Sequence, residues 1–283
     1  MNDSLLQKIK GLNLAGIYKT ADARIEYAGR ENLSHLEFLE VLINDEYLSR
    51  GRNRRERLIS NARFPQSKTL EEFNFPFQPS LNRNQIYNLA ACEFVRRKEN
   101  IAFIGGSGVG KTHISIAIGN SAIDQGYTVL FTPLSDMLED LYMSRADNSF
   151  RQKLMKYVRP DLLIVDELGL KKLNQTSVDD FYDVVSKRYE ARSTIVTTNK
   201  PFDEWGRIFY DLQLASAILD RFVHHCHFIV IDGPSYRMRD RSAEQQVGKA
   251  GRRGKAGGNG NVEPSTSGLS DGDKGGAGDE QPV

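Results

Sequence analysis

The sequence predicts an α/β fold in which a parallel sheet lies between helices, preceded by a small all-helical domain and followed by a disordered tail. The first observation is that helical patterns separate five short apolar runs, at residues 101–104, 128–131, 162–165, 195–198 and 228–231. Such near-continuous apolar runs are typical of parallel strands that are buried on both faces. The second observation is that residues 1–80 contain no comparable run. The third is that no aromatic residue follows Tyr236.

The first 80 residues have the spacing of helices. Ser34 and Glu37 match a capping box, which marks a helix N-terminus. Four apolar residues then recur at helical intervals and are expected to belong to a small helical bundle: Leu36, Leu39, Ile43 and Tyr47. The helix is expected to end at Phe64-Pro65. An extended connector follows, in which Phe73, Phe75 and Phe77 are expected to pack on a neighbouring surface.

These patterns divide the chain into three expected parts. The helical domain with its connector covers residues 1–80, the α/β domain covers residues 81–241, and the tail covers residues 242–283. From Gly248 the tail consists mainly of Gly with Ser, Pro and charged residues. Such a composition cannot bury enough apolar surface to fold, so the tail is expected to be disordered.

Composition limits the class of protein. The 283 residues carry a formal charge of +1, from 38 Lys and Arg and 37 Asp and Glu, so any nucleic-acid binding depends on local patches. Cys92 and Cys226 have neither metal-ligand nor disulfide spacing, which fits a reducing compartment. The sequence shows no basic-then-apolar leader and no apolar stretch of membrane-spanning length. We therefore expect a cytoplasmic protein without a membrane partner.

A glycine-rich motif lies directly after the apolar run at residues 101–104. Residues 105–112 read Gly-Gly-Ser-Gly-Val-Gly-Lys-Thr, the full pattern G-x-x-x-x-G-K-[ST], and a helical stretch follows. Glycines let backbone N–H groups turn toward phosphate oxygens, Lys111 can reach the β- and γ-phosphates, and the Thr112 hydroxyl can bind Mg²⁺. The motif predicts that ATP with Mg²⁺ is held by Gly105, Gly106, Ser107, Gly108, Val109, Gly110, Lys111 and Thr112.

Polar residues follow the third and fourth apolar runs. Asp166 and Glu167 come after residues 162–165, on a strand expected to neighbour the strand of the phosphate loop. There Asp166 would hold Mg²⁺ and Glu167 would polarise the attacking water. The alternative is a strand that ends in two solvated acids, and the upstream phosphate loop favours the catalytic interpretation. Asn199 is predicted to orient water or contact the γ-phosphate, with the start of a turn before Pro201 as its alternative.

Several arginines are candidates for nucleotide contact. Arg221 ends a helical stretch just before the last strand. In a monomer Arg221 would form a surface ion pair of little energetic weight, whereas in an oligomer it could neutralise transition-state charge in the next subunit's site. Arg207, in a probable loop, and Arg237 with Arg239, beyond the final strand, are weaker candidates.

Basic residues gather in two parts of the chain. The first group has Glu56 as its only acid and favours duplex DNA over a merely solvated helix face: Arg50, Arg52, Arg54, Arg55, Arg57 and Arg63. The second group lies between the second and third strands, at Arg145, Arg151, Lys153, Lys156 and Arg159, and Lys171 with Lys172 follows the two acids. Neither group is interleaved with enough aromatic residues for single-strand stacking, which again favours duplex DNA.

Three histidines lie close together before the last strand, at His224, His225 and His227. No matched acids or cysteines accompany them in the sequence. They are therefore interpreted as packing or surface residues rather than as a metal site.

Together these motifs resemble the AAA+ ATPases of the DnaC and IstB group, and IstB more closely. The resemblance extends to about residue 241 and lies in Arg54-Arg55 and in residues 62–65, 68–73, 105–112, 162–167, 197–199, 217–221 and 235–237. The phosphate loop is shared by many families, whereas the Arg-Phe-Pro to Glu-Glu-Phe connector and the Ser-Tyr-Arg ending are more particular. The tail after Gly248 is not part of the resemblance, so no role is transferred to it.

The resemblance implies an AAA+ P-loop ATPase that helps insertion-sequence transposition. The protein would assemble with ATP on duplex DNA as a ring or spiral, select the target and stimulate a cognate transposase. DNA-stimulated hydrolysis would then drive disassembly. Lys111 and Thr112 would bind phosphates and Mg²⁺, Asp166 and Glu167 would serve metal and water, Asn199 would sense the γ-phosphate, and Arg221 would act in trans.

Three alternatives stay open at the level of sequence. A DnaC-like loader of a replicative helicase would share the ATPase core but grip a helicase with its N-terminal domain. A small-molecule kinase would need an acceptor pocket and a lid, and the series of Asp-Glu, Asn and Asp-Arg argues against it. A nucleotide-gated scaffold with negligible turnover is disfavoured by Glu167.

Overall fold

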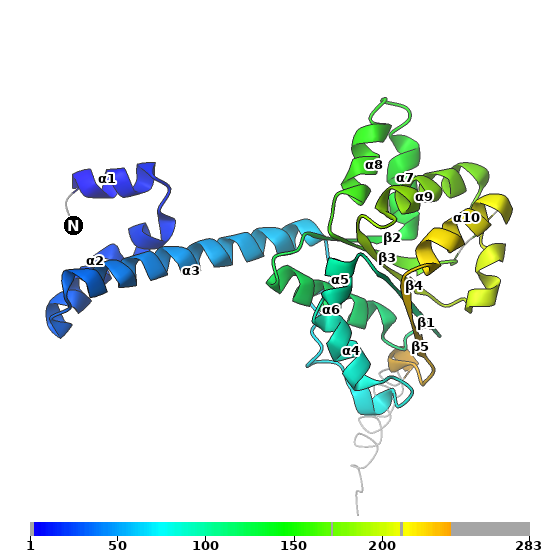
Figure 1. The fold of residues 1–283 in the computed structure, drawn as a ribbon, viewed down its shortest axis with the longest axis horizontal. Coiled ribbons are helices and arrows are strands. Elements are labelled where there is room, and N and C mark those ends of the chain that lie inside the picture. Colours follow the sequence, from blue (N-terminus) through cyan, green and yellow to red (C-terminus); the bar gives the residue numbers. More distant parts are fainter. Residues whose placement is uncertain (1–2, 171, 210–211, 239–283) are drawn as a thin grey trace, which may run out of the picture. The chain divides into compact units, whose positions relative to one another are not determined.

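Five parallel strands form one sheet in the computed structural model, in the spatial order β2-β3-β4-β1-β5 (Figure 1). The strands are β1 (Asn100–Gly105), β2 (Val129–Pro133), β3 (Leu162–Leu168), β4 (Ser193–Thr198) and β5 (Cys226–Ile231). All four pairings are parallel, as the apolar runs predict. The structure describes residues 3–170, 172–209 and 212–238. The expected boundary at residue 241 and the expected disordered tail lie outside these residues.

Helices cover both faces of the sheet. One face packs on α4 (Arg83–Ala90), α5 (Glu93–Arg97) and α6 (Lys111–Asp124). The other face packs on α7 (Leu134–Met143), α8 (Phe150–Val158), α9 (Gln175–Arg188), the short η2 (Phe202–Arg207) and α10 (Leu212–Val223). Strand residues alternate between the two cores, since Ile101 and Phe103 face the first and Ala102 and Ile104 face the second. The nearly continuous apolar strands follow from this burial on both faces.

The position of β4 corrects one expectation. β4 pairs with β1 through Ile101 and Ile195 and with β3 through Leu163 and Thr194. The sequence suggested that the strand ending in the two acids lies beside the phosphate-loop strand. This expectation is wrong, because β4 lies between the two strands. The crossover from β1 to β2 skips two positions in the sheet, and β4 later fills the position beside β1.

The N-terminal segment consists of α1 (Asp3–Gly11), α2 (Ala15–Glu31) and α3 (His35–Ala62). The capping box is confirmed, because the Ser34 hydroxyl accepts from the Glu37 N–H and the Glu37 carboxylate accepts from the Ser34 N–H. The end of α3 is confirmed as well, since Arg63 adopts φ +58° directly before Phe64-Pro65. Within the described residues, no helix combines the length and the hydrophobicity that a bilayer crossing requires.

The apolar stripe of α3 does not form the core of a bundle. Leu36, Leu39, Ile43 and Tyr47 are 54 to 75% exposed. The helix α2 packs on another side of α3, because Gly16 allows close approach to the backbone of Asp45 and Glu46. The Glu46 carboxylate then accepts hydrogen bonds from the N–H groups of Gly16 and Ile17, at 2.7 and 3.2 Å. These contacts orient α2 away from the stripe.

The connector between α3 and α4 packs on the α/β domain. Leu70 and Phe73 are buried in the same core as β1 and α6, and Phe75 packs against that core, so the predicted packing of the aromatic rings is confirmed. The connector is not extended throughout, because Phe75–Phe77 forms a 3₁₀ turn, η1, whose N-cap is Asn74. A domain boundary at residue 80 stays a prediction.

Candidate functional site

The phosphate loop joins the end of β1 to the first turn of α6. Gly108 and Gly110 have φ values of +79° and +103°, which glycine adopts without strain. Space is equally limiting, because a Cβ atom on Gly105 would lie 2.3 Å from the carbonyl oxygen of Ile231. A Cβ atom on Gly110 would lie 2.5 Å from the Phe73 ring. Glycine thus allows a turn at the start of α6 where N–H groups can receive an anion.

The Lys111 side chain lies across the loop. Its Nζ donates hydrogen bonds to the carbonyl oxygens of Gly105 and Gly106, at 2.8 and 2.7 Å. Burial lowers the pKa of Lys111, and the positive charge of Arg237 also lowers it, whereas Asp166 and Glu167 act in the opposite direction. A phosphate anion beside the ammonium would offset the desolvation, so this position favours a polyanionic ligand.

Thr112, Asp166 and Thr197 form a hydrogen-bonded group at the carboxyl edge of the sheet. The Thr112 hydroxyl lies 2.9 and 3.1 Å from the two carboxylate oxygens of Asp166. The Thr197 hydroxyl donates to Asp166 Oδ1 and accepts from the Glu167 N–H at 3.0 Å. Hydroxyl and carboxylate oxygens are hard donors that Mg²⁺ prefers, so Thr112 and Asp166 fit that ion. Thr197 escaped the sequence reasoning because only the β3–β4 pairing brings it to Asp166.

Glu167 lies in a strained bulge. The register of β3 with β4 shifts between Val165 and Leu168, and Glu167 adopts φ +66° with an exposed side chain. The Thr198 hydroxyl fixes the far end of the bulge by donating to the Leu168 carbonyl oxygen at 2.7 Å. A non-glycine residue at positive φ is costly and is enriched at functional sites. The bulge keeps the Glu167 carboxylate off the sheet and open to solvent.

Asn199 directly follows β4 at the same edge of the sheet. Its side chain is exposed, and no hydrogen bond links it to the phosphate loop among the described residues. The turn after it is fixed, because the Lys200 N–H donates to the Thr198 hydroxyl at 3.0 Å and Trp205 Nε1 donates to the Lys200 carbonyl oxygen at 3.1 Å. Its role toward water or a γ-phosphate stays a prediction.

The segment after β5 closes on the phosphate loop. The Tyr236 N–H donates to the Gly108 carbonyl oxygen at 2.9 Å, and Arg237 Nη1 donates to the Ser107 hydroxyl at 3.4 Å. A Cβ atom on Gly108 would meet the Ser235 hydroxyl at 2.2 Å, so Ser235 occupies the space that glycine leaves. Arg237 thus lies within this site in its own chain, and Arg239 lies outside the described residues.

The connector supplies further contacts that the sequence alone did not indicate. His113 Nε2 lies 2.8 Å from the Thr69 carbonyl oxygen, and the Tyr236 hydroxyl donates to the Asn74 carbonyl oxygen at 2.6 Å. Gln78 is fully buried and donates from Nε2 to the Pro234 carbonyl oxygen at 2.7 Å. Thr69, Asn74 and Gln78 are far from the glycine motif in sequence, so the Phe-rich composition of the connector and its place in the family resemblance were the signals that could have found them.

The contacts of Arg221 lie on α9 and α10. Its Nη1 donates to the Ala217 carbonyl oxygen at 3.1 Å, and the guanidinium lies over the Tyr182 ring at 5.1 Å. In the described part of its own chain, no hydrogen bond connects Arg221 with the phosphate loop. Arg207 ends η2 and is exposed. A role for either residue in a neighbouring subunit stays a prediction.

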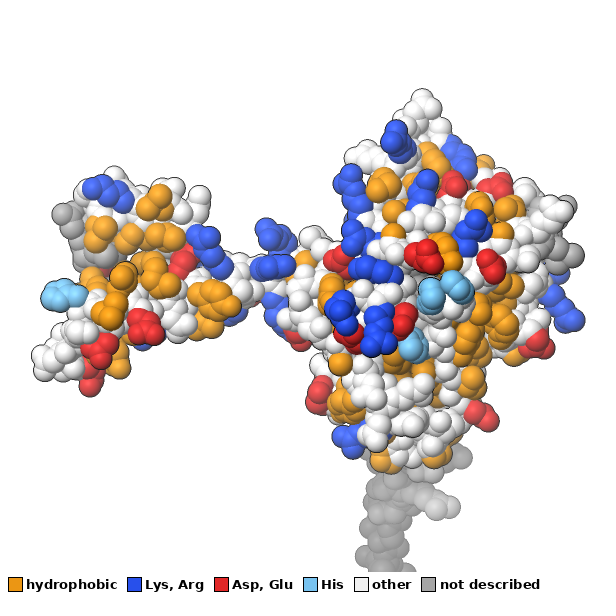
Figure 2. Space-filling model, viewed as in Figure 1, with side chains coloured by type: hydrophobic (Ala, Val, Ile, Leu, Met, Phe, Trp, Pro, Cys, Tyr) orange, Lys and Arg blue, Asp and Glu red, His pale blue; other side chains and the backbone are white. Residues whose placement is uncertain are grey.

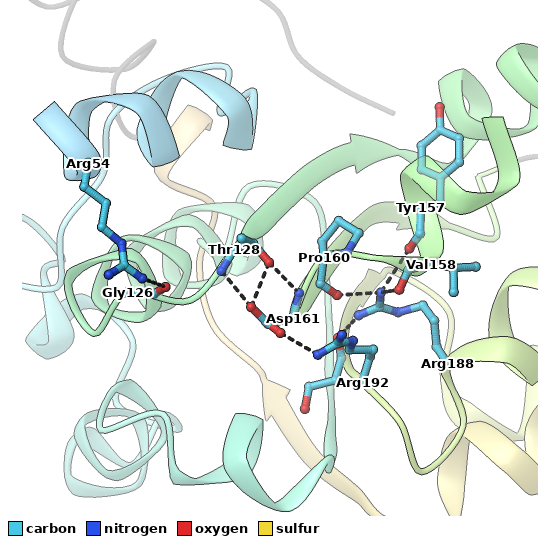
Figure 3. Close-up of polar contacts among 10 residues, drawn as sticks. Arg54, Gly126, Thr128, Tyr157, Val158, Pro160, Asp161, Arg188 and Arg192 are labelled. Atoms are coloured by element: carbon cyan, nitrogen blue, oxygen red, sulfur yellow. Dashed lines mark hydrogen bonds and ion pairs between the residues drawn. The ribbon is translucent and has the colours of Figure 1, made fainter. Parts of the chain in front are cut away.

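The basic group on α3 is less free of counter-charge than its sequence suggests. Arg50 Nε pairs with Glu46 at 2.7 Å, and Arg55 Nε pairs with Asp124 at 2.5 Å. Arg54 donates to the Gly126 carbonyl oxygen at 3.4 Å (Figure 3). Arg52 and Arg57 are exposed and form no ion pair within the described residues. Lys and Arg side chains gather along α3 in Figure 2.

Of the second basic group, three members are paired. Arg145 contacts Asp180, and Lys153 and Lys156 both contact Asp140, each at 2.7 Å. Arg151 and Arg159 are exposed and line a groove along α8. Lys172 is also exposed, and Lys171 lies outside the described residues.

Comparison with known proteins identifies the family. The family model for IstB-like ATP binding proteins matches residues 7–244. The chain belongs to this family. An insertion sequence IS5376 ATP-binding protein from Geobacillus stearothermophilus is 36% identical over 249 residues, which cover 88% of this chain and 99% of that protein. An insertion sequence IS21 ATP-binding protein from Pseudomonas aeruginosa is 38% identical over 220 residues, which cover 78% of this chain and 83% of that protein.

Comparison with solved structures supports the fold. The crystal structure of DnaI matches 62% of this chain and 92% of its own, with a TM-score of 0.50 and 21% sequence identity. At this level of identity the likeness concerns the fold alone. The family member described here therefore has an AAA+ P-loop fold with a parallel five-stranded sheet.

Proposed function

We propose that this chain is an ATPase that binds duplex DNA with ATP and Mg²⁺, assembles into an oligomer and serves insertion-sequence transposition in the cytoplasm. In this role it selects the target DNA and stimulates a cognate transposase. Hydrolysis of ATP then releases the assembly from DNA.

The observation that carries the proposal is the group of Thr112, Asp166 and Thr197 beside the phosphate loop. Loop N–H groups and Lys111 bind the phosphates, and Thr112 and Asp166 hold the metal ion. When bound there, Mg²⁺ would supply positive charge that neutralises the phosphates. Glu167, exposed in its bulge, orients the attacking water and accepts its proton. Asn199 orients the same water, and Arg221 neutralises transition-state charge in the neighbouring subunit.

The link to transposition comes from the relatives. The Geobacillus stearothermophilus and Pseudomonas aeruginosa proteins are both named for the insertion sequences to which they belong. The first is matched over 99% of its length, so the likeness includes the N-terminal helices as well as the ATPase domain. This full-length likeness favours a transposition helper over a loader of a replicative helicase.

The exposed arginines of α3 are the part of the predicted DNA surface that is free to bind phosphate. We expect Arg52 and Arg57 to contribute most to duplex binding. Lys171 and Lys172, which follow the two acids in the sequence, are proposed as further contacts. Arg50, Arg54 and Arg55 contribute less, because each already has a partner in its own chain.

The test measures ATP hydrolysis and particle size with and without duplex DNA across a salt series. The double variant Arg52→Ala with Arg57→Ala is expected to dissociate from duplex DNA at a lower salt concentration than the wild type. The plot of log affinity against log salt concentration should become less steep, by about 2. Lys19→Ala with Arg30→Ala is the matched control, because it removes two exposed charges from α2. Equal losses in both variants would show a general charge effect and contradict the assignment.

A second variant separates the remaining alternatives. Glu167→Gln is expected to abolish hydrolysis and to prolong the lifetime of assemblies on DNA. Loss of hydrolysis without longer lifetimes would contradict hydrolysis-driven release. If the wild-type rate of ATP hydrolysis does not change with duplex DNA but increases when a replicative helicase is added, the helicase-loader function would be favoured instead.

A further inference from the structure

The turn after α9 and the turn after α10 bring together three side chains that the sequence keeps apart. Among the described residues, the potential ligand atoms of Glu190, His224 and His225 all lie within 4.8 Å of one another. His225 Nε2 is 3.8 Å from Glu190 Oε1, and the centroids of the two imidazole rings are 4.0 Å apart. Figure 2 shows histidine side chains beside acidic ones on the visible face. The sequence argued against a metal site because no matched acid accompanies these histidines along the chain. In the structure, Glu190 is that acid.

We propose that Glu190, His224 and His225 bind a divalent first-row transition metal ion, with Zn²⁺ as the best chemical match. Two imidazoles and one carboxylate form a ligand set that Zn²⁺ accepts, with water in the fourth position. Mg²⁺ prefers oxygen ligands, so this site and the site at Thr112 and Asp166 select different ions. All three side chains are exposed, which gives an ion direct access.

A neighbouring tyrosine fixes one of the ligands. The Tyr189 hydroxyl lies 2.9 Å from His224 Nδ1, so one nitrogen of this imidazole already has a hydrogen-bond partner. Ligand histidines in metal sites commonly hold such a contact through the nitrogen that does not bind the ion, and it sets the orientation of the ring. Tyr189 is therefore a positioning residue for the site.

The turn that carries the histidines is anchored by the buried Asn100. Its side-chain Nδ2 donates to the Phe222 carbonyl oxygen, and its Oδ1 accepts from the Thr194 N–H, both at 2.9 Å. Its backbone N–H donates to the His225 carbonyl oxygen at 2.7 Å. Asn100 thus ties the end of α10 and the start of β5 to β4.

The turn that carries Glu190 is anchored by the fully buried Arg188. Its Nη1 donates to the carbonyl oxygens of Tyr157, Val158 and Pro160, at 3.0, 2.9 and 2.9 Å (Figure 3). Glu190 follows at φ +54°, a backbone conformation that persists only where its surroundings hold it. Both turns are therefore ordered without an ion, and binding costs little conformational entropy.

The place of the site in the fold suggests what the ion does. The three ligands lie at the amino ends of β4 and β5, on the opposite edge of the sheet from Lys111 and Asp166. His224 is one turn beyond Arg221, and its N–H donates to the Asp220 carbonyl oxygen at 3.1 Å. An ion shared by Glu190 and the histidines would clamp the end of α10 to the end of α9. It would therefore stabilise the helix that carries Arg221.

The test is calorimetric titration of the full chain, without a histidine tag or nucleotide, with Zn²⁺. We expect one equivalent to bind and the melting temperature to rise. His224→Ala and His225→Ala are each expected to weaken binding at least tenfold. His227→Ala is the matched control, because His227 Nε2 instead pairs with Glu99 at 2.7 Å. Asp166→Asn should leave the affinity unchanged, which separates this site from the nucleotide site.

Two further measurements distinguish ligand roles from folding defects. Tyr189→Phe should weaken Zn²⁺ binding about tenfold while the ATPase rate stays unchanged. Co²⁺ should give visible bands without a thiolate charge-transfer band, because the three ligands are a carboxylate and two imidazoles and include no cysteine. Full binding by His224→Ala with His225→Ala would overturn the proposal. So would the absence of binding by the wild type at about 100 µM Zn²⁺.

Discussion

Gly108 shows how tightly single residues of the phosphate loop are constrained. Its φ of +79° disfavours any side chain, and a Cβ atom would lie 2.2 Å from the Ser235 hydroxyl. We expect Gly108→Ala to weaken nucleotide binding by about 5- to 150-fold, since strain of about 1–3 kcal/mol falls on the loop. Titration with a fluorescent ATP analogue measures this effect.

A double variant separates the two causes at Gly108. Ser235→Gly in the Gly108→Ala background removes the clash but not the backbone strain. We therefore expect partial recovery of affinity. Wild-type affinity in Gly108→Ala alone would show that the loop does not hold this conformation when nucleotide binds.

Thr197 is the residue through which β4 acts on the two acids. Its hydroxyl donates to Asp166 and accepts from the Glu167 N–H. We expect Thr197→Val to lower the hydrolysis rate by about 10- to 100-fold, because groups that orient metal ligands typically contribute this much. Affinity for ATP without Mg²⁺ should change little. Steady-state kinetics across Mg²⁺ concentrations measures the rate, and titration with a fluorescent ATP analogue in the presence of a chelator measures the affinity.

Thr132→Val provides the control for that substitution. Thr132 is also a buried strand threonine, but its hydroxyl donates to the neighbouring Pro133 carbonyl oxygen. We expect near-normal hydrolysis. Equal loss in the two variants would assign the effect to sheet packing rather than to the orientation of Asp166 and Glu167.

At the scale of elements, α2 and α3 are joined through Glu46. Its carboxylate accepts from the first N–H groups of α2, and Arg50 donates to its other oxygen. We expect Glu46→Ala to destabilise the N-terminal helices by about 1–3 kcal/mol, since buried donors lose their acceptor. In thermal unfolding followed by far-UV circular dichroism, part of the helical signal should be lost at a lower temperature than in the wild type. The fluorescence transition of buried Trp205, the only tryptophan, should stay unchanged.

The same contact has a pH dependence. Burial alone would raise the pKa of Glu46, but the hydrogen bonds from Arg50, Ile17 and Gly16 outweigh it and lower the pKa below its ordinary 4.5. A carboxyl group with a lowered pKa stabilises the fold above its unfolded pKa, and this stability is lost as the pH falls through the folded pKa. The stability difference between wild type and Glu46→Gln should therefore be constant near neutral pH and shrink below about pH 4.5. A difference that grows on acidification would refute this sign.

At the scale of the whole molecule, the proposed role of Arg221 requires more than one subunit. Lys111→Ala removes a phosphate ligand, and Arg221→Ala removes the charge offered to the neighbour. We expect each variant alone to lose hydrolysis and an equal mixture to recover part of it, because some interfaces then combine an intact loop with an intact arginine.

Arg207→Ala is the matched control for Arg221→Ala, because it removes an exposed arginine from a neighbouring element. If Arg221 is the residue that acts in trans, the Arg207→Ala variant alone should keep most of its hydrolysis activity. No recovery in the mixture of Lys111→Ala with Arg221→Ala, in assemblies of normal size, would place the function of Arg221 within its own chain.

Much of the fold could be predicted because its signals are local. The five apolar runs became strands, and Ser34 and Glu37 formed their capping box. The exposure of Leu36 could not be predicted, since helical spacing shows that residues share a face but not which element covers it. The position of β4 was also missed, because the order of strands depends on crossovers rather than on the strands' own composition.

The sequence by itself determined the chemistry of the nucleotide site, since the glycines, Lys111 and Thr112 are consecutive and the loop needs each at its own spacing. Only the tertiary structure decided which distant groups meet: Thr197 at Asp166, Arg237 at Ser107, and Glu190 beside His224 and His225. The physical reason is that backbone conformation and capping depend on neighbours in the chain. Hydrogen bonds across strands and between turns depend instead on how the whole sheet is paired and covered.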